Sequence, residues 1–290
     1  MSGTYLFRCF LCLPALALTF SSSYALEDDE WLGASYRPFL LSLNYFKDGD
    51  EQMWRTDFSA GLANFSELSF FYSDYAEIND NAGFSAWRAA WSSDPYANWG
   101  GGLAYSFRGS RNNIEIDELQ LSAFHYFDKI KLRLQYKQAD IAVFTRDRVI
   151  RNFDFPESAE LKRNTFALDL SRSYSDWGWQ FQAAVLDYDK DVARALNSRL
   201  FLRAFDELVL SQLLGLSEWQ WSAALNRRFG KTGLTVGFQQ AQQVVDASKQ
   251  NVVDVSLSYA FSEGFSTELG LWYEFEDRQT PVNLGLVWQW

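Results

Sequence analysis

The sequence predicts an all-β fold, a transmembrane antiparallel up-and-down β-barrel of about 14 strands, with 12 strands as the main alternative. Three observations predict it. Apolar and polar residues alternate over segments of about 10–13 residues. Trp and Tyr gather near the ends of these segments, in a chain of 290 residues that is 18% aromatic. The connections between segments alternate between short and longer.

The first 25 residues have the features of a secretory signal peptide. Arg8 precedes an apolar run, residues 9–20, that is too short to span a bilayer as a stable helix. Ser23 and Ala25 place small residues at the positions that a signal peptidase reads, so we expect cleavage after Ala25; a retained anchor is the less favoured alternative. Cys9 and Cys12 leave with this peptide, and the mature chain then has no disulfide or cysteine metal ligand.

The charge of the mature chain argues against a general role in nucleic-acid binding. Removal of Arg8 leaves 25 of the 26 basic residues against 37 acidic ones, a formal charge of −12 at pH 7. A nucleic-acid binder needs a basic surface instead. No mature segment approaches the roughly 18 consecutive apolar residues of a membrane-spanning helix. A secreted soluble β protein and a membrane barrel are the two classes that remain.

The alternation shows most clearly in residues 129–136 and 218–225, "KIKLRLQY" and "EWQWSAAL". Such a period of two gives each strand one apolar and one polar face. The segments are longer than the roughly 5–6 residues of ordinary strands and match a tilted strand that crosses a bilayer. Closure of the sheet is then required, because hydrocarbon leaves an open backbone edge unsatisfied.

We expect a periplasmic N-terminal tail at 26–34 and the barrel at 35–290. The expected strand cores are 35–46, 54–63, 67–75, 84–92, 99–108, 115–126, 129–144, 161–172, 176–188, 217–228, 233–245, 251–261, 265–275 and 281–290.

The connections predict the orientation in the membrane. Tight turns are expected at 93–98, 127–129, 173–176, 229–233 and 262–265. The longer loops between them include 145–160 and 189–216, which we expect on the extracellular side. Short periplasmic turns and longer extracellular loops are the bacterial pattern. With an even number of strands, both termini then lie on the periplasmic side.

Residues 191–216 break the period of two. Ala193, Leu196, Leu200, Ala204 and Leu208 follow a helical spacing, and an extra β-hairpin is the alternative. An apolar loop of this length suits a plug in the lumen, a contact with the lipid interface or a binding surface for a partner.

The C-terminal residues "NLGLVWQW" resemble the β-signal of Gram-negative outer-membrane proteins, through Asn283, Gly285, Trp288 and Trp290. The resemblance to this class implies an outer-membrane location, recognition of the last strand by the insertion machinery, and a porin-like or autotransporter-like barrel. Leu284, Leu286, Trp288 and Trp290 would then face lipid.

Catalytic chemistry has little support in the sequence. His125, the only histidine, has the phase of lipid-facing residues close to a periplasmic turn, where it suits an aromatic girdle. Known outer-membrane hydrolases use a His beside a nucleophile or water. The run Gly100-Gly101-Gly102 lacks the Lys-Ser/Thr of a phosphate loop and reads as a bend or gap within a strand. We expect no enzyme, cofactor or metal site.

The polar faces of the strands supply candidate pore-lining residues. The expected basic wall consists of Lys131, Arg133, Lys137 and Arg163. The other candidates for the lumen are Glu118, Asp169, Arg108, Glu218 and Arg228, together with Arg88, Asp254, Glu268 and Glu274. Charges that line an aqueous lumen can select ions by sign. The predicted function is a narrow channel for small polar or anionic solutes. The alternatives are a closed structural, adhesive or autotransporter-like barrel and, less favoured, a membrane hydrolase.

Overall fold

The computed structural model describes most of the chain between Phe39 and Gln289. The described ranges are 39–48, 51–62, 66–77, 83–94, 97–110, 114–144, 158–189, 216–244, 247–262, 264–275 and 282–289. The expected signal peptide and tail, nearly all of the 191–216 segment and Trp290 lie outside them. Within the described ranges, no helix is long and apolar enough to cross a membrane.

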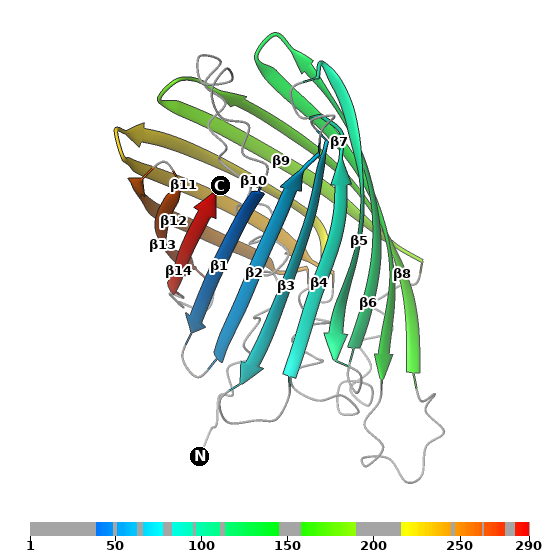
Figure 1. Ribbon diagram of the computed structural model, residues 1–290. Helices are drawn as coiled ribbons and strands as arrows, with labels where there is room; N and C mark the ends of the chain where they lie inside the picture. The colour runs from blue at the N-terminus through cyan, green and yellow to red at the C-terminus, as the bar shows by residue number, and fades with distance from the viewer. Residues whose placement is uncertain are drawn as a thin grey trace, which may run out of the picture.

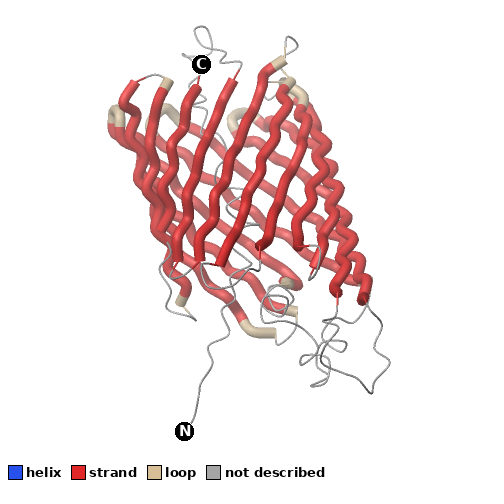
Figure 2. Tube along the Cα trace, turned by 60° about the horizontal axis from the view of Figure 1, so that its bottom comes forward, coloured by secondary structure: helices blue, strands red, loops and turns tan. Residues whose placement is uncertain are grey.

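The strands form one closed antiparallel barrel in which neighbours in sequence are neighbours in space (Figures 1 and 2). The prediction of 14 strands is confirmed. The strands are β1 (Phe39–Asp48), β2 (Glu51–Gly61), β3 (Glu67–Glu77), β4 (Gly83–Ser92), β5 (Trp99–Ser110), β6 (Ile114–Phe127), β7 (Ile130–Phe144), β8 (Ser158–Ser173), β9 (Trp177–Tyr188), β10 (Ser217–Phe229), β11 (Thr232–Gln243), β12 (Lys249–Ser262), β13 (Phe265–Glu274) and β14 (Val282–Gln289).

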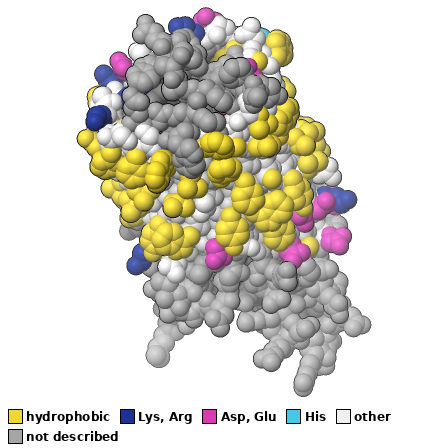
Figure 3. All heavy atoms as spheres, in the orientation of Figure 1, with side chains coloured by type: hydrophobic (Ala, Val, Ile, Leu, Met, Phe, Trp, Pro, Cys, Tyr) yellow, Lys and Arg dark blue, Asp and Glu magenta, His cyan; other side chains and the backbone are white. Residues whose placement is uncertain are grey.

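The outer face of the barrel is apolar. On β6, Leu119 and Leu121 are 45% and 49% exposed, while the side chains between and beside them point inward. Hydrophobic side chains form a broad band across the face seen in Figure 3, with charged side chains toward its edges. An apolar band of this kind is the surface that lipid requires of a barrel.

The two rims differ in their connections. At one rim, residues 128–129, 174–176 and 230–231 join successive strands in tight turns; we call this the short-turn end. At the other, residues 145–157 and 189–216 separate the strands; we call it the long-loop end. The β1–β2 connection, residues 49–50, is an exception that the sequence did not predict, since β2 begins at Glu51 and not at 54.

The barrel closes where β1 pairs with β14, and this seam depends on one small residue. Asn44 of β1 lies directly opposite Gly285 of β14, and both point inward. A Cβ atom on Gly285 would lie 2.6 Å from the side-chain oxygen of Asn44. Asn44 cannot turn away freely, because its Nδ2 donates to Ser42 Oγ at 2.8 Å. Because residue 285 has no side chain, the hydrogen-bonded side chain of Asn44 fits at the seam.

We expect Gly285→Ala to destabilise the closed barrel by about 1–3 kcal/mol, the usual range for overpacking. Gly270→Ala is the matched control, since the nearest atom to its added Cβ would be Asn283 Cβ at 3.5 Å, an ordinary contact. Urea unfolding of protein refolded in detergent measures both. Asn44→Ala should restore much of the stability lost in Gly285→Ala. Equal stability of the two alanine variants would contradict this account.

Candidate functional site

Among the residues that the structure describes, the strongest concentration of charge inside the barrel lies on the inner face of five adjacent strands, β4 to β8. Alternation along paired strands brings six basic and two acidic residues of these strands to the lumen. From here on, the basic wall means all eight of these residues, which include the four expected from the sequence. Its members are Arg88, Arg108, Lys131, Arg133, Lys137 and Arg163, with the carboxylates of Glu118 and Asp169.

Glu118 is the centre of an ion-pair cluster. Its Oε2 accepts a hydrogen bond from Arg163 Nη2 at 2.6 Å, and its Oε1 lies 3.7 Å from Lys137 Nζ. Ala139 of β7 lies between the two strands that carry this pair: it stands opposite Glu118 of β6 on one side and opposite Arg163 of β8 on the other. The small side chain of Ala139, 1% exposed, lets the two longer ones meet across β7. The Nε of Arg163 is buried and has no acceptor among the described atoms.

A second group of wall residues has neutral partners. Arg88 Nη2 donates to Gln120 Oε1 at 3.2 Å, and Gln120 Nε2 donates to Gln135 Oε1 at 3.2 Å. Arg88 also lies within electrostatic range of Glu118 and Arg133. The glutamines carry no charge, so these bonds orient Arg88 without neutralising it.

Asp169 is held by amides. It stands opposite Arg133 in the register, and its Oδ2 accepts hydrogen bonds from Gln180 Nε2 at 3.1 Å and Gln182 Nε2 at 2.9 Å. These donors satisfy a carboxylate that is only 6% exposed. They also extend the polar lining from the basic wall onto β9.

Lys131 lies toward the short-turn end of the wall, over aromatic rings. Its Nζ is 4.8 Å from the centroid of Phe124 and 5.1 Å from that of Tyr126. Gly100 of β5 provides the space for Phe124, because a Cβ there would lie 2.2 Å from the ring. Of the two readings expected for the glycine run, a bend or a gap, Gly100 fits the gap, and the ring of Phe124 fills it.

Acidic residues line the opposite side of the barrel. Asp254 of β12 and Glu268 of β13 follow the inward phase, and β13 is seven strands from β6 around the ring of 14. Glu274 is buried nearer the long-loop end, where Gln250 donates to it and Gln243 donates to Gln250 at 2.9 Å. The basic wall and the acidic pair Asp254 and Glu268 therefore face each other across the lumen.

Two candidate residues lie apart from the basic wall. Arg228 has the inward phase but sits at the short-turn rim, where its Nε donates to the carbonyl of Gly230 at 2.9 Å. Glu218 does not line the lumen. The register shifts between Ser217 and Trp219, and Glu218 accepts a bond at 3.0 Å from Gln242, the outward-facing neighbour of Trp219. A single extra residue thus reverses the face that strict alternation predicts.

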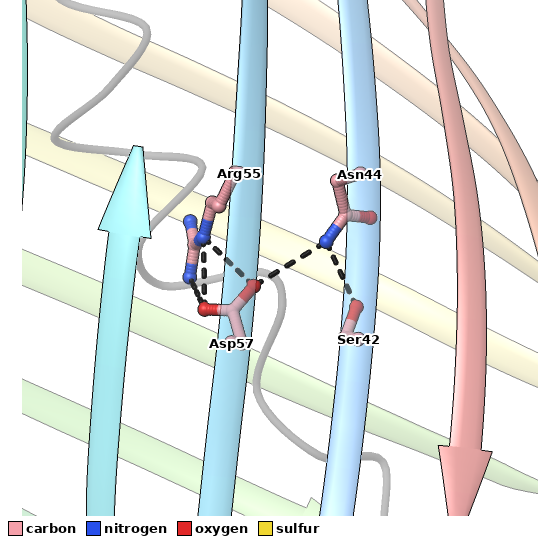
Figure 4. A network of polar contacts seen from close by, with 4 residues as sticks. All are labelled: Ser42, Asn44, Arg55 and Asp57. Carbon is pink, nitrogen blue, oxygen red and sulfur yellow. Dashed lines mark hydrogen bonds and ion pairs between the residues drawn. The ribbon is translucent and has the colours of Figure 1, made fainter. Parts of the chain in front are cut away.

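Sequence reasoning missed a polar network on β1 and β2 (Figure 4). Arg55 Nε donates to Asp57 Oδ1 at 2.8 Å, and Asn44 Nδ2 reaches Asp57 Oδ2 at 3.3 Å and Ser42 Oγ. The guanidinium of Arg55 also lies 4.9 Å from the ring of Phe71. The available signal was the i, i+2 spacing of Arg55 and Asp57 between the outward-facing Trp54 and Phe58.

The rim residues follow the predicted phases. Trp288 faces outward and is 59% exposed, while Asn283 and Gly285 are buried on the inner face. His125 stacks on Trp99 at 3.7 Å between ring centroids, at the short-turn rim. Its Nδ1 lies 2.8 Å from the carbonyl of Asn98. This is the aromatic surrounding expected of a girdle residue.

No protein-family model matches the chain, and no curated protein matches its sequence. Solved structures do resemble it. The outer membrane protein Omp33 of Acinetobacter baumannii aligns with a TM-score of 0.50 at 7% identity, over 88% of this chain and 98% of that one. A loop-deletion mutant of OmpT, an outer membrane protein of Vibrio cholerae, gives 0.48 at 12% identity, over 87% and 98%. The KdgM porin in complex with disordered oligogalacturonate gives 0.42 at 11%, over 87% and 99%.

At these identities the likeness concerns the fold alone, and only the first comparison reaches a TM-score that supports it. Together with the closed ring of strands and the apolar outer band, it identifies the architecture. The chain has the fold of bacterial outer-membrane β-barrel proteins, in a closed form of 14 strands.

Proposed function

We propose that the protein is a narrow porin-like channel of the bacterial outer membrane that passes small polar or anionic solutes. One observation carries the proposal: the inner faces of β4 to β8 present six basic residues against two acidic ones. Charge that faces an aqueous lumen attracts solutes of opposite sign and raises their local concentration.

The bonding of the wall leaves its positive charge in excess. Glu118 is engaged by Arg163 and Lys137, and Asp169 accepts bonds from neutral glutamines. Arg88 donates to an uncharged amide. An anion that enters the lumen would therefore find guanidinium groups whose charge is not cancelled within the wall.

The acidic pair Asp254 and Glu268 on the far side gives this field a direction. A cationic wall and an anionic wall that face each other orient a polar solute across the lumen as it passes. Anions would move along β4 to β8, away from β12 and β13. A barrel of 14 strands lies between those of about eight strands that side chains fill and the wide channels of 16–18.

Planar-bilayer recording of the purified, refolded protein tests the proposal directly. We expect single-channel conductance and, in a potassium chloride gradient, a reversal potential of the sign for chloride preference. The positive excess on the inner wall is the reason for that sign. A cation preference would contradict the role of the wall.

A closed barrel without an open pore is the second candidate, and a separate observation favours it. Ile114, Ile116 and Ile141 point inward near the long-loop end, with exposures of 0%, 5% and 1%. Leu161 beside them is 7% exposed. These side chains have little contact with water, so this part of the inner wall is closely packed and apolar. A refolded protein with no conductance above background would favour this reading over a channel.

Variants of the wall should shift selectivity in opposite directions. Lys131→Gln with Arg133→Gln removes two positive charges, whereas Glu118→Gln removes the charge that Lys137 and Arg163 engage. Two charges about 4 Å apart in water interact by about 1 kcal/mol, which corresponds to roughly a fivefold change in the chloride-to-potassium permeability ratio. We expect that ratio to fall in the double variant and to rise in Glu118→Gln.

The control for these variants is Lys162→Gln, since Lys162 lies on the outer face with a 63% exposed side chain. Reversal potentials measured under the same gradient should match those of the unmodified protein. A shift of similar size in the control would assign the effect to net charge and not to the wall.

We propose further that Asn283, Gly285, Trp288 and Trp290 form the assembly signal read by the insertion machinery. Deletion of Trp290 should then lower the amount of folded barrel in the outer membrane of cells several-fold. Refolding of the same variant in detergent should proceed normally, because recognition plays no part there. The heat-dependent shift in gel mobility reports folding in both settings. Normal insertion in cells would refute the signal.

A further inference from the structure

The outer face of the barrel carries a second group of basic residues, at the short-turn end of β8 to β10. Arg172 lies on β8 and Arg227 on β10, both on the outer, lipid-facing side. In the register Arg172 stands opposite Trp179 and Arg227 opposite Trp177, so the two arginines flank a pair of tryptophans on β9. Trp177 is 44% exposed, and Leu225 beyond it is 60% exposed, so the apolar band begins here.

The aromatic rings at this rim are ordered. Tyr174 and Trp177 stack with centroids 4.1 Å apart and planes 7° from parallel, and Tyr174 N–H donates to the carbonyl of Trp177 at 2.7 Å. The guanidinium of Arg172 lies 4.7 Å from the Tyr174 ring, and that of Arg227 lies 5.0 Å from the Phe229 ring. Rings below a guanidinium orient it while leaving its N–H groups free to bind another acceptor.

Arg172 has donors to spare. Its Nη2 lies 3.9 Å from Asp128 Oδ2, which is beyond hydrogen-bond distance, and that carboxylate is 81% exposed to solvent. Its Nε is buried, so the groups that a ligand can reach are the terminal Nη nitrogens of a side chain that is 26% exposed. A guanidinium at a lipid-facing rim with unfilled donors is suited to a phosphate oxygen.

On this side of the barrel, the net charge at the short-turn end is positive and that at the long-loop end is negative. In the turns and strand ends from β6 to β11, the short-turn end carries Lys129, Arg172, Arg227, Arg228 and Lys231 against Asp128 and Asp176. The outer face at the long-loop end of β6 to β9 carries Glu115, Asp117, Asp140, Glu160, Asp187 and Asp189 against Lys162. An anionic headgroup is therefore attracted at the first rim and repelled at the second.

We propose that Arg172 and Arg227, with Tyr174, Trp177 and Trp179 between them, form a binding site for the phosphate of an anionic phospholipid headgroup. The guanidinium groups contact the phosphate, and the acyl chains run along the exposed apolar surface of β9 and β10. The site faces lipid, so it is independent of the lumen and of any conductance.

Native mass spectrometry of the detergent-solubilised barrel, titrated separately with phosphatidylglycerol and phosphatidylethanolamine, tests the site. The unmodified protein should retain several-fold more of the anionic lipid. Arg172→Gln with Arg227→Gln should abolish that preference. The matched control is Arg228→Gln with Lys231→Gln, which removes the same charge at the same rim, with Arg228 adjacent to Arg227 but on the inner face.

The control pair should keep the preference for phosphatidylglycerol. An equal loss in both pairs would overturn the site in favour of a general charge effect, as would equal retention of the two lipids by the unmodified protein. Only the barrel that migrates as folded without heating is analysed. If the Gln pair folds poorly, Arg172→Lys with Arg227→Lys, which keeps the charge but loses the forked donor geometry, should reduce the preference at least twofold; unchanged retention would also overturn the site.

Discussion

Closure of the sheet is the constraint on which the rest of the structure depends. In hydrocarbon, an unpaired strand edge leaves N–H and C=O groups without partners, so the fourteenth strand must pair with the first. Eight register pairs, from Leu40 with Gln289 to Lys47 with Val282, make this seam. Once the ring is closed, successive side chains of each strand point alternately to the lipid and to the lumen. The apolar band and the charged interior are both consequences of that division.

Inside the ring, some large side chains depend on small neighbours. Asn44 uses the space at Gly285, and Phe124 uses the space at Gly100. Asp254 does the same at Gly237, where a Cβ would lie 2.1 Å from its carboxylate oxygen. A curved wall brings inward side chains together, and at these three positions a glycine directly opposite gives the larger side chain its space. The arrangement of charge in the lumen is thus set partly by residues that carry none.

The fold was predictable from the sequence because its signal is repeated in every strand. Alternation predicts 14 strands and the inward phase of Glu118, Lys137 and Arg163 without any knowledge of their pairing. It fails where the repeat is interrupted: the register shifts between Ser217 and Trp219, and Glu218 therefore lies on the outer face although strict alternation predicts the lumen. Contacts that depend on register, such as Arg163 with Glu118 across β7, could not be read from one strand at a time. In the Arg55 network, the pair with Asp57 lies within one strand, but its link to Asn44 of β1 could not be read without the register.

Ala139 has a consequence for how such a barrel can diverge. Its small side chain leaves the space across which Arg163 reaches Glu118. A bulkier uncharged residue at this position would separate the ion pair and leave both charges in place. The electrical character of the lumen could then change through a position that no inventory of charged residues would include. Two such barrels with identical charges could therefore prefer different solutes.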